Sequence, residues 1–337
     1  MKNARFTIVL PVRSGGVHLR QCVSSILAQS LDDFELAVLE NCSNDGTAEW
    51  LAGVGDSRIR VYPASTPLSI EQNWARAVNI PKNEFVTFLG HDDLLDPEYL
   101  KVMNTAIGEN PDAAVYHAHF RFVNENGRTI GPCRPMPARE TAAEFTKAFL
   151  HFERDANGTG YMVRSREFER AGGFPQFHKL LYADHALWLN IVSGSYVSTS
   201  PQECFSYRLH ASSTSSSSVW RDHLQAIGQL LDFLDGGHRW GEEIAEIYKA
   251  YAPGYFLKLC TNWCAIALVQ ATKQNRRLEP DVLDAFAATL ERVTPQGAEQ
   301  FRNSKSIRHR QIINSYWPMR TAYILYILAR YGRSELS

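Results

Sequence analysis

The chain has 337 residues, of which 45% are apolar and 21% charged, and its formal net charge is −1. These proportions are typical of a packed soluble protein and argue against a nucleic-acid coat or an acidic interaction tail. The length allows two ordinary domains, or one large domain with an extension.

Cysteine spacing and apolar runs exclude further classes. The six cysteines are scattered and include no CxxC pair, so a zinc site is not expected. No apolar run approaches the ~20 residues that a membrane-spanning helix needs. Pro11 and Arg13 interrupt the N-terminal apolar run before it resembles a signal peptide. We therefore expect a cytoplasmic protein.

The first 119 residues alternate strand and helix patterns. Apolar runs that predict buried strands lie at Thr7–Leu10, Phe34–Leu39, Ile59–Tyr62, Phe85–Leu89 and Val115–His119. Helical patterns separate them, with a capping box at Ser69 and Gln72. Asp96, followed by Pro97, predicts the cap of the helix after the fourth strand. This alternation implies right-handed crossovers and a largely parallel sheet.

The pattern changes after residue 119. Residues 120–215 mix short strands, helices and a turn at Asn126-Gly127, and the serine-rich stretch Ala211–Ser218 predicts a flexible link. Helical patterns follow, with breaks expected at Gly236-Gly237, Pro253-Gly254, Pro280 and Pro295. The expected domains are an α/β domain over 1–215, with halves 1–119 and 120–215, and a helical region over 219–337.

Polar residues follow three of the predicted strands. "LPVRSGG" follows the first strand, "LENCSNDGT" the second and "LGHDDLL" the fourth. Ligands of open α/β sheets bind beyond the carboxyl ends of the strands. One crevice can therefore collect Arg13, Glu40, Asn41, Asp92 and Asp93. The plainer interpretation is that strand ends are wet, but three such segments at one edge favour a site.

The two adjacent aspartates in "FLGHDDLL" suit a divalent cation, because hard cations take carboxylate oxygens and share them with phosphates. If the strand continues through them, one side chain faces the crevice while the other braces the next loop. Gly90 stands where an Asp-x-Asp pair would have its first acid. One protein carboxylate, a diphosphate and waters are still enough to hold Mg²⁺ or Mn²⁺.

Four segments together resemble the family 2 glycosyltransferases of the GT-A fold, which transfer sugars from nucleotide-diphosphate donors. "TIVLPVRSGGVHLRQCVSSILAQSLDDFELAVLENCSNDGT" resembles that family's first nucleotide-binding segment, and "IPKNEFVTFLGHDDLLDPEYL" its metal-motif segment. "MVRSREFERAGGFPQFHKLLYADHALWLNIVSGSYV" resembles the acceptor segment, and "FSYRLHASSTS" the closing segment. The resemblance implies a Rossmann-like, mostly parallel sheet flanked by helices, with an α-helical C-terminal extension.

The resemblance also implies roles, position by position. The residues expected to bind the donor nucleotide are Pro11, Arg13, Glu40, Asn41, His91 and Asp92. Asp92 also matches the metal-ligating aspartate, and His210, in "YRLH", a histidine that can approach the diphosphate or the metal, Mn²⁺ or Mg²⁺. Asp184, in "YADHALW", matches the general base. The commoner pattern has two aspartates at the Glu40-Asn41 positions, although an Asn carbonyl still accepts a hydrogen bond from a uracil-type N–H.

The implied chemistry is a single displacement with inversion at the anomeric carbon. Asp184 would take the proton of the attacking acceptor hydroxyl, an effect worth ~10²–10⁴-fold, and a cation on Asp92 would stabilise the leaving diphosphate. A UDP-sugar is the expected donor, and a surface polysaccharide or lipid-linked glycan the expected acceptor. Two plainer interpretations stay open: Asp184 as the N-cap of a helix His185–Ser193, and His210 as a structural histidine at a strand end.

Residues from about 219 onward lie outside the resemblance. The stretch Arg302–Arg333 contains seven Lys or Arg and no Asp or Glu, and it includes "YWPMRTAYILYILARY". Basic residues beside aromatic and aliphatic ones suggest peripheral contact with the inner face of an anionic membrane. A helix packed on the catalytic domain, or a homodimer contact, are the alternatives.

Two other functions share parts of this pattern. A nucleotidyltransferase would have a lysine in the glycine-rich loop after the first strand, and "PVRSGGVHLRQ" has none. A degenerate, non-catalytic glycan-binding or partner-binding protein is kept open by Gly90 and Asn41, whereas Asp92 and Asp184 argue for an enzyme. No nucleic-acid partner is expected.

Overall fold

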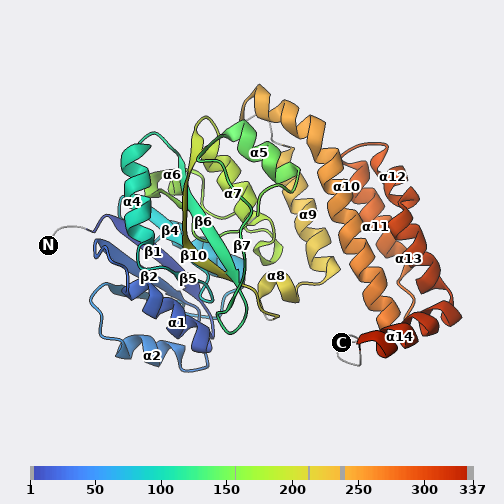
Figure 1. The fold of residues 1–337 in the computed structure, drawn as a ribbon, viewed down its shortest axis with the longest axis horizontal. Helices are drawn as coiled ribbons and strands as arrows, with labels where there is room; N and C mark the ends of the chain where they lie inside the picture. The colour runs from blue at the N-terminus through green and yellow to red at the C-terminus, as the bar shows by residue number, and fades with distance from the viewer. Residues whose placement is uncertain (1–3, 156, 212, 236–239, 332–337) are drawn as a thin grey trace. The chain divides into compact units, whose positions relative to one another are not determined.

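The structure is a computed structural model that describes residues 4–155, 157–211, 213–235 and 240–331 (Figure 1). Over these residues the chain divides into two compact units. Unit 1 comprises Met1–Ser217 with Gly237–Ile244, and unit 2 comprises Ser218–Gly236 with Ala245–Ser337.

A single sheet organises unit 1. Its strand order is β3-β2-β1-β4-β9-β6-β10-β5, with β7 paired to β6 and β8 paired to β10. The strands are β1 (Phe6–Val12), β2 (Phe34–Glu40), β3 (Ile59–Pro63), β4 (Phe85–Phe88), β5 (Leu94–Leu95), β6 (Val115–Val123), β7 (Thr129–Pro132), β8 (Arg139–Thr141), β9 (Met162–Arg164) and β10 (Tyr196–Arg208).

The predicted α/β fold with a mostly parallel sheet is confirmed, although the short strands β5, β7, β8 and β9 pair antiparallel with their neighbours. Strands β1 to β4 pair in parallel, and β10 pairs in parallel with β6. Strand β9 lies antiparallel between β4 and β6, which the sequence did not predict. A three-residue strand carries too little pattern to be recognised alone, and its place depends on strands far away in sequence.

Strand β1 runs through a proline that was expected to end it. Val9 O accepts a hydrogen bond from Leu89 N at 3.0 Å on the β4 side, and Val12 O accepts one from Asn41 N at 3.0 Å on the β2 side. Pro11 has the same parity as Val9, so its missing N–H faces the β4 side, where the pairing with β4 has already ended. The strand therefore reaches Val12 and carries its polar loop to the sheet edge.

Helices connect the strands of unit 1. They are α1 (Gly16–Leu27), α2 (Thr47–Gly53), α3 (Ile70–Ala75), η1 (Arg76–Val78), α4 (Tyr99–Glu109), α5 (Ala142–Leu150), α6 (Ser165–Arg170), η2 (His178–Leu180), α7 (Ala183–Val192) and α8 (Thr214–Ser217). The capping box at Ser69 and Gln72 is confirmed at the start of α3. The serine-rich stretch that was expected to be a link contains the short helix α8.

The predicted capping role of Asp96 is wrong. Helix α4 begins at Tyr99 with Glu98 at its N-cap position and no side-chain cap. The Asp96 carboxylate instead accepts hydrogen bonds from the guanidinium of Arg121 on β6. A charged partner 25 residues away in the chain forms a stronger, charge-assisted bond than a backbone N–H offers.

The sheet buries apolar side chains on both faces, as the alternation along its strands requires. One face of β1, with Ile8 and Leu10, joins a core that includes residues of α1 and α4. On β4 the pleat turns Phe88 to the other face, where its ring lies 4.5 Å from that of Phe168 and 5.0 Å from that of Phe174. Helices therefore cover both faces and leave the strand ends as the place for a site.

Unit 2 is helical. Its helices are α9 (Trp220–Leu234), α10 (Glu242–Lys273), α11 (Pro280–Glu291), α12 (Gly297–Asn303), α13 (Lys305–Ser315) and α14 (Trp317–Tyr331). The predicted α-helical C-terminal extension is confirmed. The break predicted at Pro280 falls at the start of α11, and that at Gly236-Gly237 lies outside the described residues.

The break predicted at Pro253-Gly254 is wrong, because α10 continues through both residues. Proline and glycine weaken a helix locally, but packing of this segment outweighs the local cost: Tyr255, Cys260 and Cys264 are all buried. Among the described residues, no helix is long and apolar enough to cross a membrane.

Gly172 and Gly173, which follow α6 in unit 1, provide a matched test of how closely this turn packs against η1. Both have a left-handed backbone, with φ of 78° and 75°. A Cβ at Gly173 would lie 2.3 Å from Val78 Cγ2, whereas a Cβ at Gly172 would meet nothing within 4 Å. We expect Gly172→Ala to lower the free energy of unfolding by about 1–2 kcal/mol, and Gly173→Ala by about 1–3 kcal/mol more. Urea denaturation of the two variants measures the difference, and equal losses would contradict the packing described here.

Candidate functional site

The loops at the carboxyl ends of β1 and β2 are tied to each other. Ser14 N donates to Ser43 Oγ at 2.9 Å, and Gly15 N donates to Thr47 Oγ1 at 3.3 Å. Gly16 N donates to Asp45 Oδ2 at 3.0 Å. The backbone of the β1–α1 loop is therefore held by side chains of the β2–α2 loop at the carboxyl edge of the sheet.

Glu40 and Asn41, at the end of β2, are buried and hold backbone in place. The Glu40 carboxylate accepts hydrogen bonds from Cys42 N at 3.2 Å and Ser43 N at 2.7 Å. The Asn41 amide bonds both backbone groups of Leu68, donating to its oxygen at 3.0 Å and accepting from its nitrogen at 2.8 Å. Arg13 Nη1 reaches the same Leu68 oxygen at 3.5 Å. Arg13 and Asn41 are thus brought together at the loop that follows β3.

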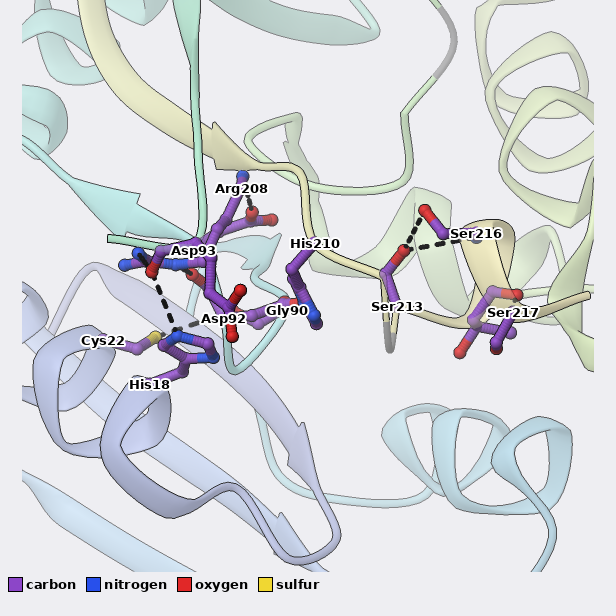
Figure 2. A network of polar contacts seen from close by, with 12 residues as sticks. His18, Cys22, Gly90, Asp92, Asp93, Arg208, His210, Ser213, Ser216 and Ser217 are labelled. Carbon is purple, nitrogen blue, oxygen red and sulfur yellow. Dashed lines mark hydrogen bonds and ion pairs between the residues drawn. The ribbon is translucent and has the colours of Figure 1, made fainter. Parts of the chain in front are cut away.

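The turn after β4 carries the two aspartates, and Figure 2 shows it. Asp92 Oδ2 lies 2.7 Å from Nε2 of His210, which follows β10. The ring of His18, from α1, lies 5.4 Å from the ring of His210. Burial lowers the pKa of His91, and the charge of Asp92 partly opposes this shift. One carboxylate and several imidazoles from distant parts of the chain therefore meet here.

Gly90 is required by this arrangement. A Cβ at position 90 would lie 2.6 Å from Asp92 Oδ1 and 3.1 Å from Asp93 Oδ2. An aspartate at 90 would therefore force the Asp92 carboxylate away from its present position beside His210. Glycine at position 90, in place of an acid, therefore leaves the room that the contact between Asp92 and His210 needs.

Asp93 braces the loop, as expected if the adjacent aspartates diverge. It is buried, and its carboxylate accepts hydrogen bonds from Thr159 Oγ1 at 2.9 Å and from Arg208 N at 2.9 Å. Burial raises the pKa of the Asp93 carboxyl, and the neighbouring charge of Asp92 raises it further. Asp92, in contrast, keeps 21% of its side chain exposed and remains available to a ligand.

Arg208 lies against the turn after β4, and its side chain is buried. Its Nε donates to the Asp92 backbone oxygen at 2.7 Å, and Figure 2 labels both residues. Its Nη1 donates to the Glu125 oxygen at 2.8 Å and its Nη2 to Gln21 Oε1 at 3.0 Å. These bonds join the turn after β4, the β6–β7 loop and α1. Arg208 therefore holds the framework of the site.

Asp184 occupies the first turn of α7. The residue at the N-cap position is Tyr182, whose φ is 64°, so the alternative interpretation of Asp184 as the N-cap is wrong. Asp184 Oδ1 accepts a hydrogen bond from His185 N at 2.8 Å. Burial raises the pKa of Asp184 to about 6, against the lowering effect of its backbone hydrogen bonds. A carboxyl with such a pKa can exchange a proton near neutral pH.

A short segment links Asp184 to the turn after β4. A Cβ at Gly158 would lie 3.4 Å from the Cβ of Asp184, and the next residue, Thr159, donates to Asp93. Gly160 N donates to Phe88 O, at the end of β4. The segment 158–160 therefore connects the surroundings of Asp184 to the turn that carries Asp92, at the carboxyl end of β4.

The donor set at Asp92 fits a divalent cation that also binds substrate. Within the described part of the chain, no group of three His, Cys, Asp or Glu side chains is placed to hold a metal ion. Asp92 and His210 supply one carboxylate and one imidazole, and diphosphate oxygens can complete the coordination. Such a site would bind its metal tightly only together with a substrate.

Sequence reasoning missed two contributors to the site. His18 lies on α1 at a helical position with no distinguishing pattern, and only the fold brings it near His210. Gly158 and Thr159 lie in a loop whose composition gave no indication of function. The closing-segment pattern identified His210, but it gave no indication that Arg208, two residues before it, bonds the backbone of two other loops.

Several known proteins that are similar in sequence to this chain are glycosyltransferases. Residues 7–165 match the family model described as glycosyl transferase family 2. An uncharacterised glycosyltransferase of Rickettsia typhi is 21% identical over 268 residues, which cover 75% of this chain and 83% of that protein. The glycosyltransferase GlyG of Streptococcus pneumoniae is 21% identical over 123 residues, covering 36% of this chain and 41% of that protein.

Solved structures show the same fold. The crystal structure of S. aureus TarS 1–349 in complex with UDP-GlcNAc aligns with a TM-score of 0.67 at 15% identity, covering 96% of this chain and 92% of that one. The mannosyltransferase PcManGT from Pyrobaculum calidifontis, in complex with GDP-Man and Mn²⁺, aligns with a TM-score of 0.52 at 16% identity, covering 97% and 88%.

Residues 7–165 therefore match a glycosyltransferase family 2 domain, and the chain has the GT-A fold of these solved structures. It is a transferase, and the comparisons favour this class over the nucleotidyltransferase alternative.

Replacing Arg208 tests its role beneath the turn. Arg208→Met would leave the oxygens of Asp92, Glu125 and Gln21 without their donor, so we expect a loss of about 3 kcal/mol in the free energy of unfolding. Arg128→Met, which changes an exposed arginine, should stay within about 0.5 kcal/mol. Denaturant unfolding of both variants measures this. A fully stable Arg208→Met protein would show that the guanidinium is not structural.

Proposed function

We propose that this protein is an inverting glycosyltransferase that moves a sugar from a nucleotide-diphosphate donor to an acceptor hydroxyl. The observation that carries the proposal is the link through Gly158 and Thr159, which joins the turn bearing Asp92 to the helix bearing Asp184. A carboxylate for the leaving diphosphate and a carboxylate for the acceptor proton are what a single displacement requires. The complex of TarS with UDP-GlcNAc supports a UDP-sugar as the donor.

Asp184 is the general base of the proposed reaction. The acceptor oxygen forms a bond to the anomeric carbon as the bond from that carbon to the diphosphate oxygen breaks. The proton of the hydroxyl passes to the Asp184 carboxylate, and the nucleoside diphosphate leaves with the bonding electrons. A pKa of about 6 makes Asp184 a stronger base than an ordinary aspartate while it is still ionised at neutral pH.

Asp92 and His210 are the proposed protein ligands of a divalent cation. Bound there, the cation would act as a Lewis acid that stabilises negative charge on the leaving diphosphate. An imidazole in the donor set favours Mn²⁺ over Mg²⁺, because Mg²⁺ strongly prefers oxygen ligands. The complex of PcManGT with Mn²⁺ supports the same choice.

The nucleoside is proposed to lie against the loops after β1 and β2. The residues assigned to it are Pro11, Arg13, Glu40, Asn41 and His91. Asn41 and Arg13 both engage Leu68, so we assign them to shaping the base pocket through the loop after β3. A neutral His91, whose pKa burial lowers, can donate or accept a hydrogen bond at the ribose.

We further propose that residues 1–215 form the catalytic domain and 219–337 a helical accessory region. The acceptor would be a growing surface polysaccharide or a lipid-linked glycan, made on the cytoplasmic face of a membrane. The names of the relatives support glycosyl transfer at this coarser level.

Asp184→Asn tests the base. The amide cannot take the proton, so kcat/KM should fall by ~10²–10⁴-fold, while the affinity for the donor stays within a few-fold. The wild-type kcat/KM should fall as the pH drops through about 6, because the base must be ionised and burial raises its pKa. Retention of more than a tenth of wild-type turnover would remove Asp184 from this role. Asp112→Asn, at an exposed aspartate, is the matched control.

Asp92→Ala tests the cation site. Calorimetric titration with a nucleoside diphosphate should show that Mn²⁺ strengthens binding to the wild-type protein but not to the variant. Asp32→Ala, at an aspartate whose side chain is 84% exposed, should behave like the wild type. If Mn²⁺ strengthened binding to Asp92→Ala as much as to the wild-type protein, Asp92 would not be the ligand.

A further inference from the structure

Helix α14 is apolar on two opposite faces. Ile327 is buried against unit 2, with only 8% of its surface exposed. On the other face the exposed apolar residues are Met319, Ala322, Leu325, Tyr326 and Ala329. Tyr316 and Trp317, at the start of the helix, are 61% and 62% exposed, and Leu325 is 60% exposed. One apolar side of α14 is covered by unit 2. The apolar residues on the other side indicate that a second apolar partner covers that side too.

Positive charge accompanies this surface. The stretch Arg302–Arg333 contains seven Lys or Arg and no Asp or Glu. Within it, α13 directly precedes α14 in the chain and packs against it. Arg308 donates to the backbone oxygen of Arg302 at 3.3 Å, and Arg310 to Ser306 Oγ at 2.6 Å. Among the described residues, neither guanidinium forms an ion pair with a carboxylate. The charge of α13 is therefore largely uncompensated.

The charge pattern distinguishes the possible occupants of the surface. A second copy bound about a twofold axis would bring two basic, acid-free surfaces together, and like charges across an interface oppose association. An acidic lipid surface instead offers negative phosphates to α13 and an apolar interior to α14. Tryptophan and tyrosine at the rim are typical of residues that lie at the level of lipid headgroups.

We propose that the outer surface of α13 and α14 docks on an anionic lipid membrane. Its docking face consists of Ile312, Tyr316, Trp317, Met319, Leu325 and Tyr326. These side chains enter the headgroup region while Arg308 and Arg310 contact lipid phosphates. The inference is independent of the reaction assigned to unit 1, and it places the enzyme at a lipid surface through α13 and α14.

Vesicle flotation of the full chain tests the proposal. We expect wild-type protein to float with vesicles of phosphatidylcholine mixed with phosphatidylglycerol, and much less with phosphatidylcholine alone. The double variant Trp317→Glu/Leu325→Glu should lose binding by more than ten-fold, because it places two acids on exposed positions of the docking face. Arg308→Gln/Arg310→Gln should lose about five-fold per charge, and high salt should weaken wild-type binding in the same way.

The matched control is Val61→Glu/Ile130→Glu, which adds the same two acids at exposed apolar positions of unit 1 and should float like the wild type. Melting temperature and donor hydrolysis should stay unchanged in all variants, which separates this proposal from the assignment of the reaction. Binding that ignores lipid charge, or that survives Trp317→Glu/Leu325→Glu, would overturn the proposal. So would a wild-type dimer that this variant converts to a monomer while neither protein floats, because the face would then be a contact between copies.

Discussion

The buried guanidinium of Arg208 is the constraint on which the site depends. A charge taken out of water is stable only when every donor finds a partner, and Arg208 finds its partners in the backbone of two loops and in Gln21 of α1. Its own backbone N–H bonds Asp93. The turn after β4, the β6–β7 loop and α1 must therefore keep fixed positions. His210, two residues later, is delivered to Asp92 by the same strand end.

This framework explains why the metal motif departs from an Asp-x-Asp pair. With Asp92 beside His210, there is no room for a Cβ at position 90. In the proposed site the imidazole of His210 would supply a ligand where the commoner motif has a further acid, whereas Asp93 is withdrawn into the protein and holds Thr159 and Arg208. Each of three positions in this motif has a distinct role: Gly90 leaves room for the Asp92 carboxylate, Asp92 contacts His210, and Asp93 braces the loop.

The two units differ in how their surfaces are used. Unit 1 concentrates polar and titratable groups at one edge of its sheet, where the carboxyl group of Asp92 meets the imidazole of His210 in a largely buried setting that strengthens their interaction. Unit 2 has apolar residues on the outside of α14 and basic residues on α13. The reaction proposed for unit 1 and the lipid contact proposed for unit 2 together suit a transferase whose acceptor is held at a membrane.

Local pattern was enough for strands β1 to β4 and β6, the capping box at Ser69 and the helical character of the C-terminal third, because periodicity and capping chemistry act over a few residues. Asp92, Asp184 and His210 could be named as candidates only because four segments resemble a known family in the same order. Local pattern failed at Asp96, where a distant arginine competes for the carboxylate, and at Pro253, where helix packing outweighs a local break.

The sequence by itself determined the fold class, the edge of the sheet where polar loops gather, and the residue types available for binding and proton transfer. Only the tertiary structure decided which of those residues meet. Four features join segments that are far apart in the chain: the insertion of β9, the approach of His18 to His210, the link from Asp184 to the turn after β4, and the burial of Arg208. Such contacts depend on the packing of the whole unit, which no local pattern contains.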